Sequence, residues 1–241
     1  MTQDVDPEKI KYDNFDARYY LEHYYSTPNG FEGGPSIEPF IFAAEKAKEY
    51  VHADYAKSSR DEVQSWIRND PTAFNWKEYV RVSLQLEGKA GSKEEVEAKE
   101  RHMRSVFKAT VFCDILTEST EVIERGYEGP YDVVHCVGCM DLCPSYDAFT
   151  VAVRKLSGLV NDRGFLHLEM GVDTTESSIQ DTYIVGDTTY AKRLHVTKDG
   201  VIEALRLAGM STTLVYEYVE DNEASAGYKD HILMIIGQKN I

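Results

Sequence analysis

The sequence has few basic residues and no long apolar run. It contains 26 Lys and Arg against 41 Asp and Glu, a net charge of −15. This charge repels phosphate backbones, so we predict no nucleic-acid partner and no anionic membrane surface. No segment approaches the roughly 18 apolar residues of a membrane span, and the N-terminus lacks the basic start and apolar stretch of a signal peptide. These absences favour a soluble, cytoplasmic protein that binds a small molecule.

Cysteine is also scarce, with four in 241 residues. Cys136, Cys139 and Cys143 lie with His135 in HCVGCMDLC. Structural zinc sites usually bring their ligands as two separated pairs, whereas this group directly follows an apolar, strand-like run. We therefore predict packing residues and no metal, and a reducing cytosol disfavours disulfides.

The apolar pattern alternates between two periods, in a chain that is 42% hydrophobic and best interpreted as one domain over 1–241. Short apolar runs typical of strands alternate with segments of helical spacing, and this predicts an α/β fold with a mainly parallel sheet and helices on both faces. The predicted strands are EYVHADY, SVFKATVFCDI, YDVVHCVG and RGFLHLEM, and the helices are RDEVQSWIRND, SYDAFTVAVRKLSGLV and TKDGVIEALRLAGM. MSTTLVYEYVE and DHILMIIGQK predict an antiparallel pair at the end of the chain.

The sequence also predicts where several helices and strands begin or end. Residues 161–164 (NDRG) predict a turn, and residues 87–100 predict a solvated loop that leads into a helix. Thr197 is the expected N-cap of the last helix, which should stop at Gly209.

A glycine-rich turn at 29–40, NGFEGGPSIEPF, has the local pattern of a loop that holds a phosphate or nucleotide-like ligand at a helix start. Such loops follow a buried strand, yet the preceding YLEHYYSTP has no run of Val, Ile or Leu. EPFIFAA could serve as a substitute strand, but these residues could then not form the helix whose N-terminus should face the ligand.

Acids follow three of the predicted strands: Asp54, Asp114 and Asp141. Ligands of open α/β sheets bind beyond the carboxyl ends of the strands, and an acid about 20 residues after a glycine turn hydrogen-bonds ribose hydroxyls in many such sites. Asp54 lies 20 residues after Gly34. The alternative is that each aspartate only caps a helix or a turn.

Together several segments resemble the family of S-adenosylmethionine-dependent N-methyltransferases that act on nicotinamide, phenylethanolamine, thioethers and indolethylamine. They are DNFDARYYLEHYY, GGPSI, HADY with NDPTAFNW, FCDI, YDVVHCVGCMDLC, RGFLHLEMGVDTT and DTYIVGDTTY, in one consistent order from about Tyr12 to the C-terminus. The resemblance implies a class I methyltransferase fold, S-adenosylmethionine as cofactor and a tyrosine-rich lid over residues 1–32. It also implies a small amine or heterocycle as substrate, and we expect a monomer.

The resemblance also implies roles for individual residues. Tyr20 and Tyr25 match lid tyrosines, for which the alternative is simple helix packing. The remaining positions match groups that hold the cofactor or lie near the acceptor: Gly33 and Gly34 in the cofactor loop, Asp54 on the ribose, Asp114 and Ile115 at the adenine, Val137 near the methionine part, and Tyr183 beside the acceptor. No catalytic residue is implied.

Two departures from the family pattern bear on activity. Glu32 stands where the loop's first glycine is expected, and Tyr25 is only eight residues from Gly33, so the helix and central first strand that the family places there are missing. Removing a central strand leaves its neighbours about 9.6 Å apart, too far for backbone hydrogen bonds. Each buried group that loses its partner costs roughly 1 to 3 kcal/mol. A shortened splice form or gene model explains the gap most economically.

A further departure concerns the acceptor. Where the family places an acid after the fourth major strand, this chain has Met170, with Glu169 beside it and Asp173 three residues on. We expect Glu169 and Asp173 to contact the acceptor.

Three functions follow from these observations. The favoured one is an S-adenosylmethionine-dependent N-methyltransferase acting on a small amine or a nitrogen heterocycle such as nicotinamide. The second is a catalytically impaired, methyltransferase-like binding or regulatory protein, because Glu32 should repel the cofactor's carboxylate. The third is a dinucleotide-dependent oxidoreductase, which lacks the strand that its glycine fingerprint requires.

Overall fold

The computed structural model describes residues 15–25, 35–119, 121–174, 182–185, 188–221 and 229–241. The chain divides into two compact units, Met1–Cys113 and Asp114–Ile241. Within the described ranges no helix is long and apolar enough to cross a membrane. Organisation as one domain over 1–241 remains a prediction.

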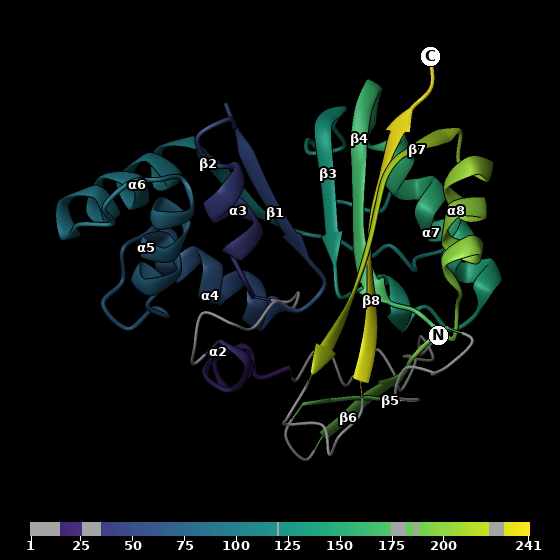
Figure 1. Ribbon diagram of the computed structural model, residues 1–241, viewed down its shortest axis with the longest axis horizontal. Helices are drawn as coiled ribbons and strands as arrows, with labels where there is room; N and C mark the ends of the chain where they lie inside the picture. The colour runs from purple at the N-terminus through teal and green to yellow at the C-terminus, as the bar shows by residue number, and fades with distance from the viewer. Residues whose placement is uncertain (1–14, 26–34, 120, 175–181, 186–187, 222–228) are drawn as a thin grey trace, which may run out of the picture. The chain divides into compact units, whose positions relative to one another are not determined.

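The first unit packs helices around a two-stranded parallel sheet (Figure 1). Its strands are β1 (Tyr50–Asp54) and β2 (Phe107–Phe112). Its helices are α2 (Ala17–Tyr24), α3 (Glu38–Ala43), α4 (Lys57–Ile67), α5 (Lys77–Leu86) and α6 (Lys93–Val106). Both strands were predicted, whereas α5 was not.

Two local features of this unit bear on the sequence predictions. EPFIFAA is not a substitute strand, because residues 38–43 form α3, with a proline in its first turn and Phe40 and Ile41 buried. Residues 87–100 are not one solvated loop, because α6 begins at Lys93, where the Ser92 and Glu95 side chains each bond the other's backbone N–H in a capping box. Lys99 on α6 is buried and its ammonium donates to the Glu87 carboxylate at 2.5 Å.

The second unit is a four-stranded sheet in the order β3-β4-β8-β7. β3 (Tyr131–Val137) runs parallel to β4 (Val160–Gly171), while β8 (Lys229–Lys239) pairs antiparallel with β4 and with β7 (Met210–Asp221). The predicted antiparallel C-terminal pair is therefore confirmed. A separate hairpin pairs β5 (Thr182–Val185) with β6 (Thr188–Lys192).

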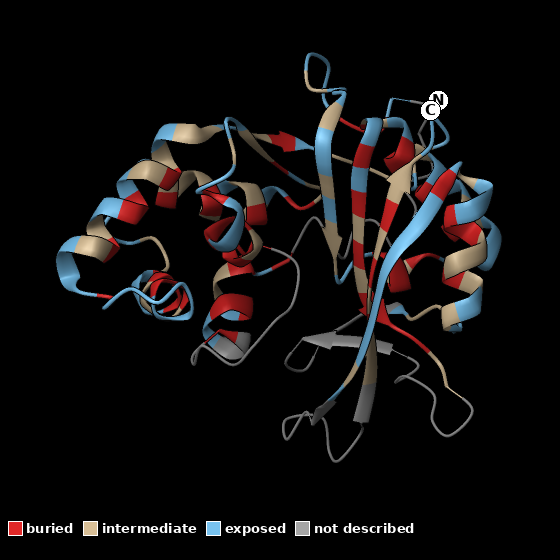
Figure 2. Ribbon diagram, turned by 45° about the horizontal axis from the view of Figure 1, so that its top comes forward, coloured by how far each residue is buried: buried red, intermediate tan, exposed pale blue. Residues whose placement is uncertain are grey.

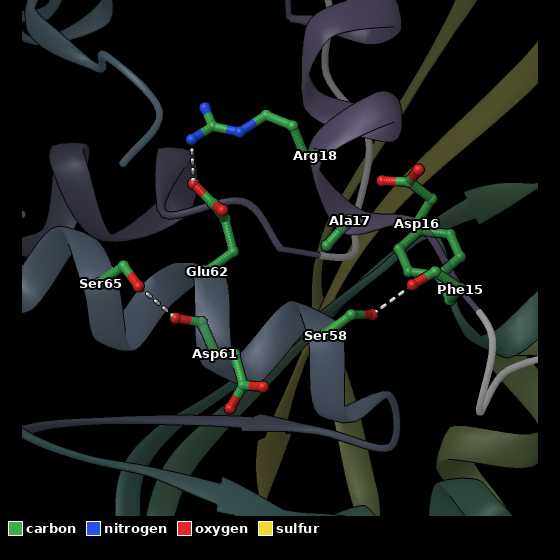
Figure 3. A pocket seen from close by; sticks show the side chains of 8 residues that line it. All are labelled: Phe15, Asp16, Ala17, Arg18, Ser58, Asp61, Glu62 and Ser65. Carbon is green, nitrogen blue, oxygen red and sulfur yellow. Dashed lines mark hydrogen bonds and ion pairs between the residues drawn. The ribbon is translucent and has the colours of Figure 1, made fainter. Parts of the chain in front are cut away.

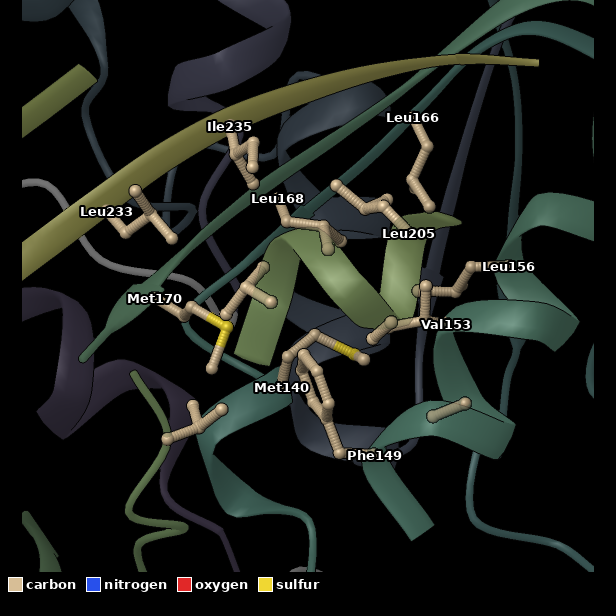
Figure 4. Close-up of a cluster of buried hydrophobic side chains, with 14 of the residues drawn as sticks. Met140, Phe149, Val153, Leu156, Leu166, Leu168, Met170, Leu205, Leu233 and Ile235 are labelled. Atoms are coloured by element: carbon tan, nitrogen blue, oxygen red, sulfur yellow. The ribbon is translucent and has the colours of Figure 1, made fainter. Parts of the chain in front are cut away.

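Two long helices, α7 (Tyr146–Gly158) and α8 (Lys198–Leu207), pack on this sheet beside the short 3₁₀ helix η1 (Met140–Leu142). Buried residues alternate along β4 (Figure 2). Leu166, Leu168 and Met170 belong to one buried cluster with residues of both helices. Figure 4 shows these side chains meeting Phe149 of α7 and Leu205 of α8. This cluster is the main core of the second unit.

The ends of α8 agree with the sequence. The Thr197 hydroxyl accepts from the Gly200 N–H, and Gly209 follows the helix with φ +77°. The prediction of a turn at 161–164 is wrong, because these residues lie inside β4. There the pairing jumps from Val160 opposite Tyr131 to Phe165 opposite Val133, and Arg163 takes φ +64°.

Candidate cofactor and acceptor sites

Asp54 ends β1 in a polar environment built by the start of α4. Its carboxylate oxygen Oδ1 accepts from the Ala56 N–H at 2.7 Å, and Arg60 donates to the Asp54 carbonyl at 2.8 Å. Burial raises the pKa of the Asp54 carboxyl to about 6, against the lowering effects of the Ala56 N–H and the Arg60 charge. A carboxylate offers about four lone-pair sites, so this group can cap its turn and still accept hydrogen bonds from a diol.

Asp114 and Ile115 follow β2 after one intervening residue, Cys113. Cys113 donates its N–H to the Asp54 carbonyl at 3.2 Å, which places the ends of β1 and β2 side by side. The Asp114 carboxylate accepts from the Leu116 N–H at 3.0 Å, and Ile115 packs against the core of the second unit. Both aspartates therefore make the local turn contacts that the alternative interpretation requires.

The predicted lid tyrosines lie in an aromatic cluster. Tyr20 and Tyr25 are 1% and 2% exposed, and their ring centroids are 6.2 Å apart. The Tyr25 ring also meets Trp76 at 5.2 Å and Tyr79 at 5.7 Å. These contacts are the helix packing that the sequence offered as the alternative to a lid role.

Helix α2 is anchored to α4, the helix that follows Asp54. A polar pocket separates the two helices, and in Figure 3 the Ser58 hydroxyl donates to the Phe15 carbonyl. The Arg18 guanidinium lies 3.4 Å from the Glu62 carboxylate, and it also donates to the Thr72 carbonyl. The start of α2 is thus fixed beside the first turns of α4.

Glu169 is the central acid of the candidate acceptor site. It is the register partner of Val137, so the structure brings these two predicted residues together. The Tyr218 hydroxyl of β7 donates to its carboxylate at 2.8 Å. Burial raises the pKa of Glu169, and the tyrosine hydrogen bond opposes that rise.

Asp173 lies just beyond the end of β4 and forms an isolated bridge with Thr197. Both of its carboxylate oxygens lie 3.1 Å from Nδ1 of His195. Asp141, the third strand-end acid, is buried in η1 and lies 3.5 Å from the Arg193 guanidinium. The segment before α8 therefore supplies a side-chain partner to each of these two acids, the His195 imidazole to Asp173 and the Arg193 guanidinium to Asp141.

The sequence did not reveal Tyr218, Arg193 or His195 as partners of the acids. Tyr218 on β7 reaches Glu169 on β4 across the intervening strand β8. The pattern of apolar residues does not determine this order of strands in the sheet. The side chain of Tyr183 and the residues Gly33 and Gly34 lie outside the described residues, although Tyr183 is in β5 opposite Ala191.

His135 and His167 form a further pair that the sequence did not predict. They are register partners on β3 and β4, with stacked rings and Nδ1 atoms 2.5 Å apart. Desolvation and the neighbouring His167 lower the pKa of His135. Cys143 is buried, with its thiol pKa raised to about 12, and is therefore an unreactive packing residue.

The architecture matches solved structures of methyltransferases. A methyltransferase from Streptomyces caelestis, CcbJ, superposes with a TM-score of 0.55 at 10% identity, covering 98% of this chain and 100% of that one. An S-adenosylmethionine-dependent methyltransferase from Methanosarcina mazei gives a TM-score of 0.52 at 11% identity, covering 84% and 87%. The fold is that of the class I methyltransferases, a class whose cofactor is S-adenosylmethionine.

Sequence comparison defines the family. The family described as NNMT/PNMT/TEMT matches residues 30–240, and the chain belongs to it. The chain is 30% identical to human nicotinamide N-methyltransferase over 177 residues, which are 73% of this chain and 62% of the relative. It is 25% identical to rabbit (Oryctolagus cuniculus) indolethylamine N-methyltransferase over 235 residues, which are 92% of this chain and 84% of the relative. The chain thus spans less than two thirds of the human relative.

Proposed function

We propose that this chain is an S-adenosylmethionine-dependent N-methyltransferase that acts on a small amine or a nitrogen heterocycle such as nicotinamide. The family match over residues 30–240 carries this proposal. It is supported by Asp54, a half-buried acid with acceptor capacity at the carboxyl end of a parallel strand, where α/β folds bind ligands. We further propose a cytoplasmic, monomeric enzyme.

The proposed cofactor contacts follow the family resemblance. Asp54 would accept the ribose hydroxyls, and Asp114 and Ile115 would hold the adenine. Val137, Gly33 and Gly34 would contact the methionine part. Tyr20 and Tyr25 are proposed to stabilise the lid through the aromatic cluster, because their burial leaves packing as their main contribution.

The proposed acceptor contacts are Glu169, Asp173 and Tyr183. Bound S-adenosylmethionine supplies an activated methyl group, so the protein needs no covalent nucleophile. Its residues would orient the acceptor nitrogen in line with that methyl and exclude water. Two carboxylates at this position favour an acceptor that carries or develops positive charge.

The test is calorimetric titration of the purified chain with S-adenosylmethionine and S-adenosylhomocysteine. We expect micromolar binding that Asp54→Ala abolishes and that Asp162→Ala, at an exposed acid inside β4, leaves unchanged. Absence of binding by a folded wild-type chain would contradict the proposal.

One observation favours the second candidate, a non-catalytic methyltransferase-like protein. Within the described ranges, β1 pairs only with β2 and β3 only with β4, so no strand occupies the place of the family's central strand. This candidate predicts a folded chain that binds neither compound in the same titration.

A further inference from the structure

One edge of β3 presents backbone groups that β4 does not use. The Gly138 N–H donates to the Glu169 carbonyl at 2.9 Å, and Cys136 is the register partner of Leu168. Successive residues of a strand direct their N–H and C=O groups to opposite sides. Cys136 therefore faces β4, while Val133 and His135 face the outer edge. In the part of the chain that the structure describes, no strand pairs with this edge.

The same geometry occurs independently in β1. Cys113 donates to the Asp54 carbonyl, and Asp54 is the register partner of Phe112. Asp54 therefore faces β2, and Val51 and Ala53 face the other edge, which pairs with no strand among the described residues. Each unit thus has an open edge on a strand whose neighbour is parallel.

The outer edge of β3 lacks the features that protect natural sheet edges. Such edges usually carry Pro, Lys or several charges. In YDVVHCV the one carboxylate, Asp132, accepts a hydrogen bond from the Asn161 amide at 2.9 Å, and Val133 is 59% exposed. At the opposite edge of the same sheet, β7 carries Glu217, Glu220 and Asp221. The composition of β3 is therefore typical of an interior strand of a parallel sheet. Such strands are covered by other elements on both faces.

We propose that the outer edge of β3 binds an extended segment of another polypeptide as an added strand. The backbone groups of Val133 and His135 would supply the hydrogen bonds, and Val133 would pack against the added side chains. A net charge of −15 on every copy disfavours a second copy of this chain. It favours a segment of β-branched apolar residues with Lys or Arg at its ends.

The probe is a fluorescently labelled peptide, Lys-Lys-Thr-Val-Thr-Val-Thr-Val-Lys-Lys, titrated by anisotropy into the full chain. The matched control peptide is N-methylated at every Thr and Val, which keeps every side chain and charge but removes the N–H groups of both edges, so that it cannot form the ladder. We expect saturable binding of the first peptide and at least about tenfold weaker binding of the second. Amide hydrogen exchange should slow at Val133 and His135.

Two variants of the chain complete the experiment. Val133→Pro removes an N–H that points away from β4, so the β3–β4 pairing keeps its hydrogen bonds. We expect it to weaken peptide binding about tenfold, while Val133→Ala, which keeps the N–H, changes it less than about threefold. If circular dichroism shows that Val133→Pro is unfolded, the N-methylated peptide and the exchange data decide alone.

Three results would overturn the proposal. They are equal binding of the two peptides, unchanged exchange at Val133 and His135, and a concentration-dependent dimer in light scattering whose formation protects the same two amides. The last result would show that a second copy occupies the edge. None of these results depends on whether the chain binds S-adenosylmethionine.

Discussion

The surroundings of Asp54 disfavour the charged form of its carboxyl group. Burial raises its pKa from 3.8 to about 6, although an N–H and a guanidinium lie close by. The sequence predicted the position of this acid from its spacing after Gly34. It could not predict the pKa, because the burial and the Arg60 contact come from how α4 packs after β1.

The raised pKa predicts a pH-dependent stability. A folded-state pKa above the unfolded value means that the folded chain binds the proton more tightly. The stability from Asp54 is therefore complete below about pH 4 and is lost as the pH rises through about 6. In urea denaturation, the unfolding free energy of the wild type relative to Asp54→Asn should fall by at most about 3 kcal/mol between pH 4 and pH 7. A constant difference would contradict this assignment.

Glu169 gives a second prediction, which concerns the choice of acceptor. Its carboxylate is partly buried and held by the Tyr218 hydroxyl, so its charge acts strongly on a nearby cation. Glu169→Gln should raise the KM for a cationic amine about tenfold and the KM for neutral nicotinamide less than about threefold. Steady-state kinetics with both acceptors measure this. Equal increases for the two would exclude a direct charge interaction.

At the scale of the elements, the period of the apolar residues predicted most strands and the three helices α4, α7 and α8, but it did not predict register. Residues 161–164 resemble a turn in sequence, yet the structure places them in β4 as an irregular pairing against Tyr131. Turn-forming residues and a strand bulge have the same composition, so only the partner strand distinguishes them. Helix α5 was not predicted, because its apolar residues recur at nearly every second position, which is the spacing of a strand.

Gly164 gives a prediction for this irregular segment. A Cβ added there would lie 2.8 Å from Val160 Cγ1 and 2.9 Å from the Asp132 carbonyl oxygen, which the backbone of β3 fixes in place. Gly164→Ala should destabilise the chain by about 1 to 3 kcal/mol. The matched control is Gly158→Ala in α7, where the added Cβ meets nothing within 4 Å and should be neutral or stabilise by up to about 1 kcal/mol. Thermal denaturation compares the two, and equal midpoints would contradict the close approach.

At the scale of the whole molecule, the chain has the class I methyltransferase fold, and among the residues that the structure describes each of its parallel strand pairs has an edge that pairs with no further strand. The sequence predicted a missing strand because Tyr25 is only eight residues from Gly33. It could not show whether EPFIFAA would replace that strand, because apolar segments of six or seven residues suit either a strand or a helix. The structure forms α3 there and leaves β1 and β3 with one partner each among the described residues.

The most direct test of the central claim is transfer of the tritiated methyl group from S-adenosylmethionine to a panel of small amines and nitrogen heterocycles that includes nicotinamide. We predict a labelled N-methyl product from at least one acceptor, with loss of that product in Asp54→Ala and its retention in Asp162→Ala. A folded chain that binds S-adenosylhomocysteine but labels no acceptor would contradict the claim, and would identify this protein as a member of the family that binds without catalysis.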